Sequence, residues 1–71
     1  MKTIFIGNTV TYKAAGKISR LNGDSGKILS GKVTGFDRIG EEDYVEIAPR
    51  MTKFGMMGSI VPLSKILSVK A

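Results

Sequence analysis

Three short segments between residues 31 and 66 decide the fold: Gly31-Lys32-Val33-Thr34-Gly35-Phe36, Tyr44-Val45-Glu46-Ile47 and Ile60-Val61-Pro62-Leu63-Ser64-Lys65-Ile66. Each is rich in β-branched or aromatic residues, which favour strands, and polar turns separate them. In the third segment, the proline and the residues after it indicate a single 3-10 turn. The layout predicts an all-β fold: a small, bent barrel of five to six short antiparallel strands, with a 3-10 turn before the last strand.

The first half of the chain predicts the remaining elements less clearly. We expect a first strand over residues 3–6, a turn at Gly7-Asn8, and a second, half-buried strand in which Val10 and Tyr12 alternate with Thr11 and Lys13. Residues 14–26 are expected to form a long loop or an irregular hairpin, since Asn22-Gly23 is a strong turn signal. Its apolar side chains, Ile18 and Leu21, are the expected inward anchors.

Residues 27–36 carry the clearest strand pattern. Two glycines on one face of a strand suit a sheet that curls onto itself. An acidic hairpin over residues 37–43 follows, and a return strand begins at Tyr44, with Val45 and Ile47 inward and Tyr44 outward. Alternation places four residues together on one face of the strand over residues 27–36: Leu29, Gly31, Val33 and Gly35.

Length and composition predict one domain over residues 1–71, with no disulfide or zinc to stabilise it, because cysteine and histidine are absent. Stability must come from strand pairing and packing, or from homodimer formation. Lys2 precedes an apolar run over residues 3–6 that is far shorter than an export signal. No run approaches the ~20 apolar residues of a membrane span. We therefore expect a cytoplasmic protein with no membrane association.

No residue constellation specifies a reaction. Without histidine or cysteine, the usual general base and the thiolate nucleophile are both missing, and Ser25 has no histidine to activate it. Ile28 follows Gly26-Lys27 where a phosphate-binding loop needs serine or threonine. The acidic residues 37–43 lack the ligand spacing of a calcium loop. We expect no catalytic residue, metal site, cofactor or small-molecule substrate, and thus a non-enzymatic binding module.

The formal charge of +5 is unevenly distributed and points to an anionic partner. Residues 1–32 carry a net charge of +5, residues 33–46 carry −4, and residues 47–71 carry +4. The leading hypothesis is that the module binds nucleic acid, RNA or DNA, by neutralising phosphates and stacking bases on tyrosine. The candidate residues are Lys13, Lys17, Arg20, Lys27 and Lys32, with Tyr12 and Tyr44 as stacking platforms.

The alternative is a protein partner. Methionine is flexible and polarizable, and it suits adaptable contact surfaces. The segment over residues 51–57 combines three methionines with a phenylalanine, which predicts an apolar contact loop of a small adaptor or inhibitor, or of a homodimer. The residues concerned are Met51, Phe54, Met56 and Met57.

Several of these segments together resemble a known superfamily. Gly7-x-x-Val10, Gly31-Lys32-Val33-x-Gly35, the acidic hairpin, Tyr44-Val45-Glu46-Ile47 and Val61-Pro62-Leu63-x-x-Ile66 are similar to the SH3-like small barrels, which include KOW, Tudor and Sm-type modules. The resemblance covers about residues 7–69. It implies a barrel whose last strand follows a 3-10 turn, and the binding of RNA, DNA or peptide segments on the exposed sheet and its loops.

Overall fold

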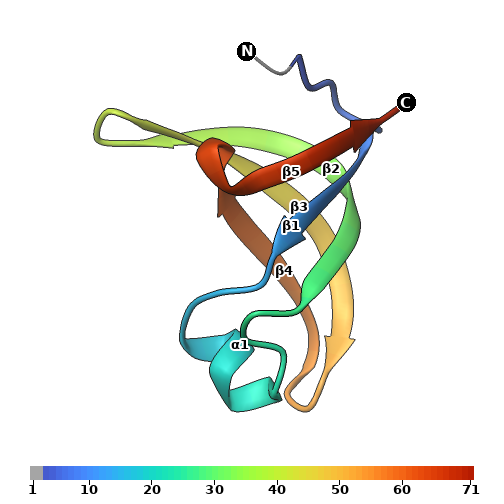
Figure 1. The fold of residues 1–71 in the computed structure, drawn as a ribbon, viewed down its shortest axis with the longest axis vertical. Coiled ribbons are helices and arrows are strands. Elements are labelled where there is room, and N and C mark those ends of the chain that lie inside the picture. Colours follow the sequence, from blue (N-terminus) through green and yellow to red (C-terminus); the bar gives the residue numbers. More distant parts are fainter. Residues whose placement is uncertain (1–2) are drawn as a thin grey trace.

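Within residues 3–71, five antiparallel strands lie side by side in the order β4-β3-β2-β1-β5 (Figure 1). The structure is a computed structural model that describes these residues, apart from the side chain of Ile18; Lys2 lies outside the described residues. In chain order the elements are β1 (Thr9–Lys13), α1 (Lys17–Asn22), β2 (Ile28–Ile39), β3 (Glu42–Thr52), β4 (Gly55–Pro62), a 3-10 turn (Leu63–Lys65) and β5 (Ile66–Lys70). The prediction of a small all-β fold with a 3-10 turn before the last strand is confirmed.

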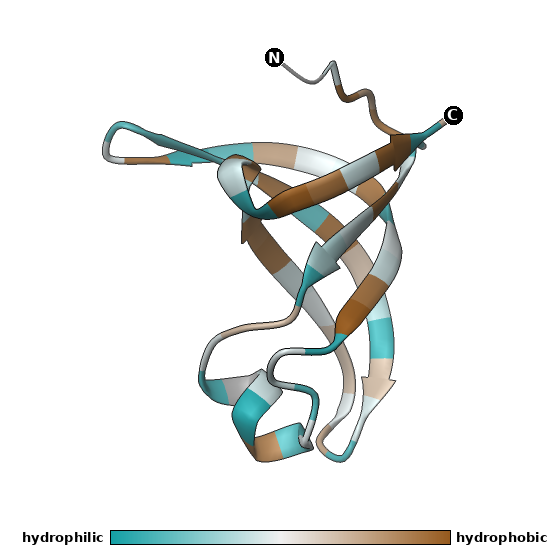
Figure 2. Cartoon of the chain, in the orientation of Figure 1, coloured by the Kyte–Doolittle hydropathy of each residue, from teal (hydrophilic) through white to brown (hydrophobic). Residues whose placement is uncertain are grey.

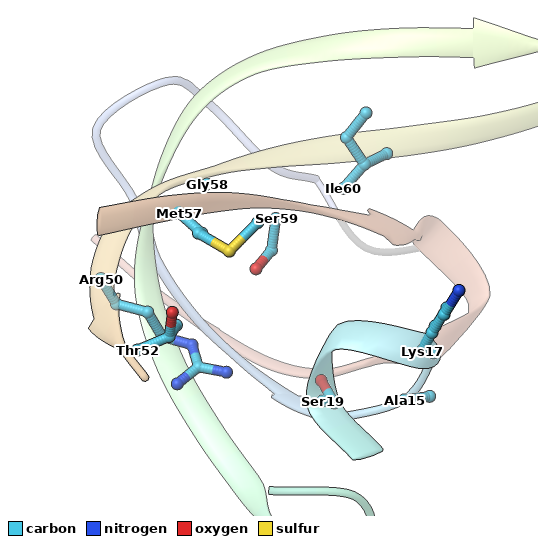
Figure 3. A pocket seen from close by; sticks show the side chains of 10 residues that line it. Ala15, Lys17, Ser19, Arg50, Thr52, Met57, Gly58, Ser59 and Ile60 are labelled. Carbon is cyan, nitrogen blue, oxygen red and sulfur yellow. The ribbon is translucent and has the colours of Figure 1, made fainter. Parts of the chain in front are cut away.

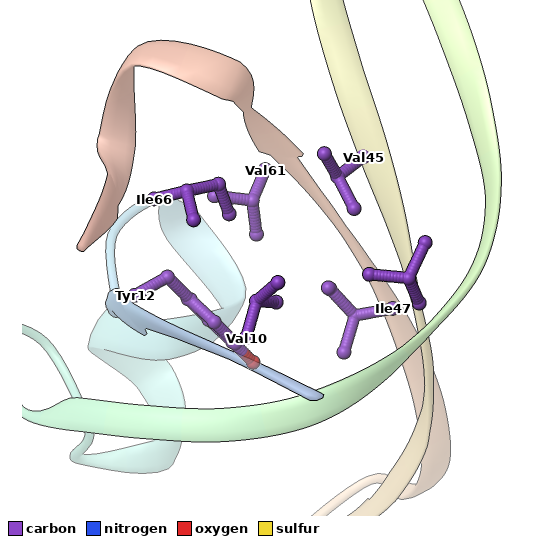
Figure 4. Close-up of a cluster of buried hydrophobic side chains, with 7 residues drawn as sticks. Val10, Tyr12, Val45, Ile47, Val61 and Ile66 are labelled. Carbon is purple, nitrogen blue, oxygen red and sulfur yellow. The ribbon is translucent and has the colours of Figure 1, made fainter. Parts of the chain in front are cut away.

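Strand β2 belongs to both halves of the sheet. Its first part, from Ile28 to Lys32, pairs with β1, and its second part, from Val33 to Ile39, pairs with β3. The two halves fold toward each other across this strand and enclose a cluster of apolar side chains (Figure 4). The cluster consists of Val10, Tyr12, Val33, Val45, Ile47, Val61 and Ile66.

Two local features allow β2 to bend. Gly31 faces the core, where a Cβ atom would overlap Cγ2 of Ile47. A β-bulge between Val33 and Gly35 then inserts one extra residue, so that Gly35 lies opposite Glu46 instead of facing the core. The prediction that Gly35 lies on the same face as Gly31 is therefore wrong, because one inserted residue shifts the alternation by one position.

The strand predicted over residues 3–6 is absent from the described chain. The Asn8 amide donates to the carbonyl of Phe5 over 3.1 Å, and the Asn8 Oδ1 atom accepts from the Phe5 amide over 2.9 Å. Gly7 has a φ of 96° within this turn. The turn at Gly7-Asn8 is thus confirmed, and it directs residues 3–5 away from the ladder, although Ile4 still contacts the core.

Residues 14–26 contain a short helix, α1, instead of the predicted loop or hairpin. Gly23 ends the helix with a φ of 82°, and its amide donates to the Arg20 carbonyl. The Asp24 amide donates to the Ser19 carbonyl over 2.8 Å. These two bonds form a Schellman motif, which satisfies the last carbonyls of a helix. Leu21 is exposed, so its prediction as an inward anchor is wrong.

The return strand follows the prediction. Val45 and Ile47 are buried, and the acidic hairpin is present. Its strands extend further than expected, with Ile39 paired to Glu42, so the turn itself holds two residues. The first of them, Gly40, has a φ of 64°, which suits a tight II′ turn. The hairpin extends beyond the rest of the sheet, and its tip is hydrophilic (Figures 1 and 2).

The close approach at Gly31 predicts a stability effect. Replacing Gly31 with alanine should lower the free energy of unfolding by about 1–3 kcal/mol, because Ile47 must move within a filled core. The matched control is Gly35→Ala, whose Cβ would meet the mobile end of the Glu46 side chain. That variant should stay within about 1 kcal/mol of the parent in chemical denaturation. Equal midpoints for both variants would contradict this account of the bend.

Candidate functional site

A lysine- and hydroxyl-bearing surface covers the outer side of β5, β1 and β2. Strand pairing places Thr9 between Lys70 and Lys32 in one row across the three strands. The next row joins Ser68, Thr11 and Ser30. A third row holds Lys13 opposite Ile28. We call this surface the Lys–hydroxyl face; its residues are Thr9, Thr11, Lys13, Ser30, Lys32, Ser68 and Lys70.

No carboxylate lies among the residues of the Lys–hydroxyl face or beside them on β1 and β5. Neighbouring strands are about 4.8 Å apart, which separates the backbones of Lys32 and Lys70 by about 10 Å. The hydroxyls of Thr11 and Ser68 hydrogen-bond to each other over 2.5 Å between the lysine rows. Ammonium groups bind phosphate as point charges, and hydroxyls donate to phosphate oxygens. The arrangement is therefore suited to a chain of phosphates.

The structure brings together only part of the predicted basic set. Lys13 and Lys32 lie on the Lys–hydroxyl face, whereas Lys17 and Arg20 are exposed on α1 and Lys27 precedes β2. The Ala14 amide donates to the Lys27 carbonyl over 2.8 Å, which keeps Lys27 next to the end of β1 that carries Lys13. These three cations extend the basic region beyond the sheet.

Sequence reasoning missed Lys70. Its position two residues after Ser68 indicates that both side chains share a face, but the chain alone does not show that β5 pairs with β1. That pairing brings the end of the chain next to its beginning. The contribution of Lys70 therefore depends on topology, which no local pattern contains.

The two tyrosines do not join the basic residues. Tyr12 is 3% exposed and belongs to the core, so its prediction as a stacking platform is wrong. Tyr44 is half-buried and lines a hollow of about 290 Å³ together with Phe36 and Leu63. Asp37 and Asp43 line the same hollow, and their carboxylates repel phosphate. Tyr44 is therefore separate from the Lys–hydroxyl face.

A polar network attaches the α1 loop to the β3–β4 hairpin. The Asp24 Oδ2 atom lies 2.8 Å from Arg50 Nη2 and accepts from Asn22 Nδ2 over 2.5 Å. Asn22 Oδ1 in turn accepts from the Lys53 amide over 2.7 Å. The hydrogen bond from Asn22, followed by that from Arg50, lowers the pKa of Asp24 below its ordinary value of 3.8. Helix α1 has no side-chain N-cap. It is held in place by this network and by the two backbone hydrogen bonds that join Ala14 to Gly26 and Lys27 at the base of the loop.

Two hollows lie along the free edge of β4. The larger, of about 220 Å³, lies between α1 and β4 and includes Lys17 and Arg50 in its wall (Figure 3). The smaller, of about 110 Å³, includes Lys13 and Lys65. Both share Ala15, Ser59 and Ile60, so they form one groove, which we call the β4-edge groove.

The predicted methionine loop divides between two sides of the sheet. Met51 and Met56 are a cross-strand pair on β3 and β4, with exposed fractions of 69% and 61%. Phe54 is exposed in the turn between them. Met57 points the other way and lines the larger hollow beside Arg50 (Figure 3). An apolar contact surface at this place would therefore consist of Met51, Phe54 and Met56 without Met57.

Among residues 3–71, no group of three or more histidine, cysteine, aspartate or glutamate side chains is placed to hold a metal ion. None of the helices in the described part of the chain has the length and apolar character needed to cross a membrane. Comparisons of the chain with protein-family models, with curated proteins and with solved structures found no match.

The lowered pKa of Asp24 predicts an acid-sensitive contribution to stability. A folded-state pKa below that of the unfolded chain stabilises the fold above about pH 4, and the contribution is lost as the pH falls through 3.8 toward the folded-state pKa. Urea denaturation at a series of pH values should show a smaller loss over this range in Asp24→Asn than in the parent. Glu41→Gln, in the exposed β2–β3 turn, is the control. A pH profile of Asp24→Asn parallel to that of the parent would contradict this role of Asp24.

Proposed function

We propose that this protein is a non-enzymatic module that binds nucleic acid through the Lys–hydroxyl face. The observation that carries the proposal is the gathering of Lys13, Lys32 and Lys70 around a row of hydroxyls, with no carboxylate among them. Neutralising phosphates releases counterions, which supplies sequence-independent affinity. The acidic residues of the β2–β3 hairpin lie on another part of the fold, so they do not cancel this charge.

The binding mode follows from the composition of the face. Its side chains are lysines, threonines and serines, which contact phosphate and sugar groups. An exposed aromatic ring is missing from these rows, so base stacking is not part of the proposal. Arg20 and Lys27 add phosphate contacts at the α1 end, whereas Lys17 lines the larger hollow beside β4. The proposed preference is therefore for backbone shape and charge rather than for base sequence.

Membership of the SH3-like superfamily and a cytoplasmic location are parts of the same proposal. The strand order and the 3-10 turn before β5 support the first, since the superfamily implies such a layout. Members commonly bind nucleic acid on the exposed sheet and its loops. The Lys–hydroxyl face is such an exposed sheet.

The test compares two triple variants of equal net charge. Replacing Lys13, Lys32 and Lys70 with alanine should weaken the binding of labelled DNA or RNA about tenfold at low salt. It should also reduce the slope of log affinity against log salt by about 2–3, in fluorescence anisotropy. Replacing Lys17, Lys53 and Lys65 should change both quantities much less. Equal losses in the two variants would show that net charge alone drives binding and would overturn the face assignment.

A second candidate function, docking on a protein partner, is favoured by the exposed Met51–Met56 pair. Exposed apolar side chains that lie opposite each other on two strands form the kind of patch that partners cover. Phe54 extends this patch at the turn. Methionine side chains adapt to different surfaces, as an adaptor or inhibitor requires.

For this candidate, Met51→Asp combined with Met56→Asp should abolish capture of a protein partner in quantitative cross-linking and leave the circular dichroism spectrum unchanged. The control introduces the same charges elsewhere on exposed apolar residues, through Phe5→Asp and Ile6→Asp. Two results would count against this surface: capture of the partner by the methionine variant, or equal loss of capture in the methionine variant and the control variant. Sedimentation of the parent over a concentration series would reveal whether the partner is a second copy.

A further inference from the structure

The free edge of β4 is open to an additional strand. Within residues 3–71, β4 pairs with β3 alone, and it lies at one end of the strand order. On an edge strand, every second residue directs its amide and carbonyl groups away from the sheet. The β4-edge groove follows this edge, because residues 57–62 contribute its wall.

The groove has room for another backbone. Its opposite wall begins with Ala15 and Gly16, which have the smallest side chains, and Ser59 is similarly short on the β4 side. Ile60 and Pro62 supply apolar surface along the edge. An added strand needs a spacing of about 4.8 Å from β4 and pockets for alternate side chains. Small residues at the wall with apolar patches between them meet both needs.

The positive charges that line the groove favour a negatively charged occupant. Every charged side chain that lines the two hollows is a cation: Lys13, Lys17, Arg50 and Lys65. Arg50 is paired with Asp24 through Nη2, while its buried Nε atom has no hydrogen-bond partner. A carboxylate entering the groove therefore meets cationic side chains along its length.

Two other occupants fit less well. A second copy pairing through its own β4 edge would bring identical cations together, and like charges across an interface are unfavourable. A single-stranded nucleic acid would find no exposed ring for base stacking, because Tyr12, the one aromatic residue of the groove wall, is buried.

We propose that the β4-edge groove binds an extended acidic segment of another protein, which adds to β4 as a further strand. Main-chain hydrogen bonds to the free edge hold the segment, and its alternating carboxylates contact the cations of the groove. This peptide site overlaps the Lys–hydroxyl face at Lys13 alone. The protein would accordingly be able to hold a protein segment and a nucleic acid at the same time.

The experiment uses a fluorescein-labelled peptide as long as β4 in which glutamate alternates with valine. Its affinity for the full chain is measured by anisotropy, beside a peptide in which lysine replaces every glutamate. Two further peptides carry N-methyl groups on all glutamate or on all valine residues. Since alternate residues of a strand face opposite edges, each methylated peptide has lost the donors of one edge only.

The variants separate this site from the nucleic-acid face. Lys17→Glu combined with Lys65→Glu reverses two exposed charges of the groove, and Lys32→Glu combined with Lys70→Glu reverses two on the Lys–hydroxyl face. The groove variant should lose peptide affinity by about tenfold or more and keep nucleic-acid affinity within about threefold, and the face variant should do the reverse. If both variants keep their nucleic-acid affinity, the proposed nucleic-acid function is rejected. The peptide site is not affected by that result.

The expected result is binding of the acidic peptide, no binding of the lysine peptide, and retention of affinity by one methylated peptide but not the other. Equal behaviour of the two methylated peptides would overturn strand addition. Binding of the lysine peptide as tightly as the acidic one would overturn the charge argument. Displacement of the peptide by a single-stranded oligonucleotide would assign the groove to nucleic acid and reject the proposal. The proposal would also be rejected if the parent binds no peptide but self-associates, and the groove variant does not self-associate.

Discussion

The bend of β2 at Gly31 and Thr34 is the constraint on which the rest of the structure depends. At Gly31 the missing side chain lets Ile47 approach the strand, and the extra residue after Val33 changes which face points inward. The same strand can then serve two neighbours, β1 and β3, whose sheets lie on opposite sides of the core. A straight β2 would leave the small apolar residues of the core exposed. In a chain without cysteine or histidine, this closure takes the place of a disulfide or zinc constraint.

The bend also separates the charges. Lysines and hydroxyls occupy the outer side of the half built from β5, β1 and β2, whereas most carboxylates gather on the β2–β3 hairpin beyond the sheet. The α1 loop and the β3–β4 hairpin lie together at the opposite end, where Asp24 and Arg50 join them (Figure 1). The charge asymmetry of the sequence thus becomes a spatial division into a basic sheet, an acidic arm and a polar junction.

Local patterns predicted those features that depend on neighbouring residues. Alternation placed Val10 and Tyr12 on one face of a half-buried strand and identified Val45 and Ile47 as core positions, and proline placed the 3-10 turn. The same alternation, applied consistently, would also have removed Tyr12 from the stacking candidates. Helix α1 was missed because six residues are too few to show helical periodicity, and Asn22-Gly23 is compatible with a hairpin turn or a helix end. The bulge at Thr34 and the place of Lys70 depend on partners distant in the sequence, so no local signal reveals them.

The bond between the Thr11 and Ser68 hydroxyls joins residues 57 positions apart in the chain. Strands β2, β3 and β4, in contrast, follow one another through tight turns and pair with their immediate successors. Closing a long loop costs more chain entropy than closing a short one, and folding rates fall as contacts become more distant in sequence. The meander of β2, β3 and β4 is therefore expected to form early, and the docking of β1 with β5 to be the late, slow step. The Lys–hydroxyl face would then exist only after folding is complete, so a nascent or partly folded chain would lack it.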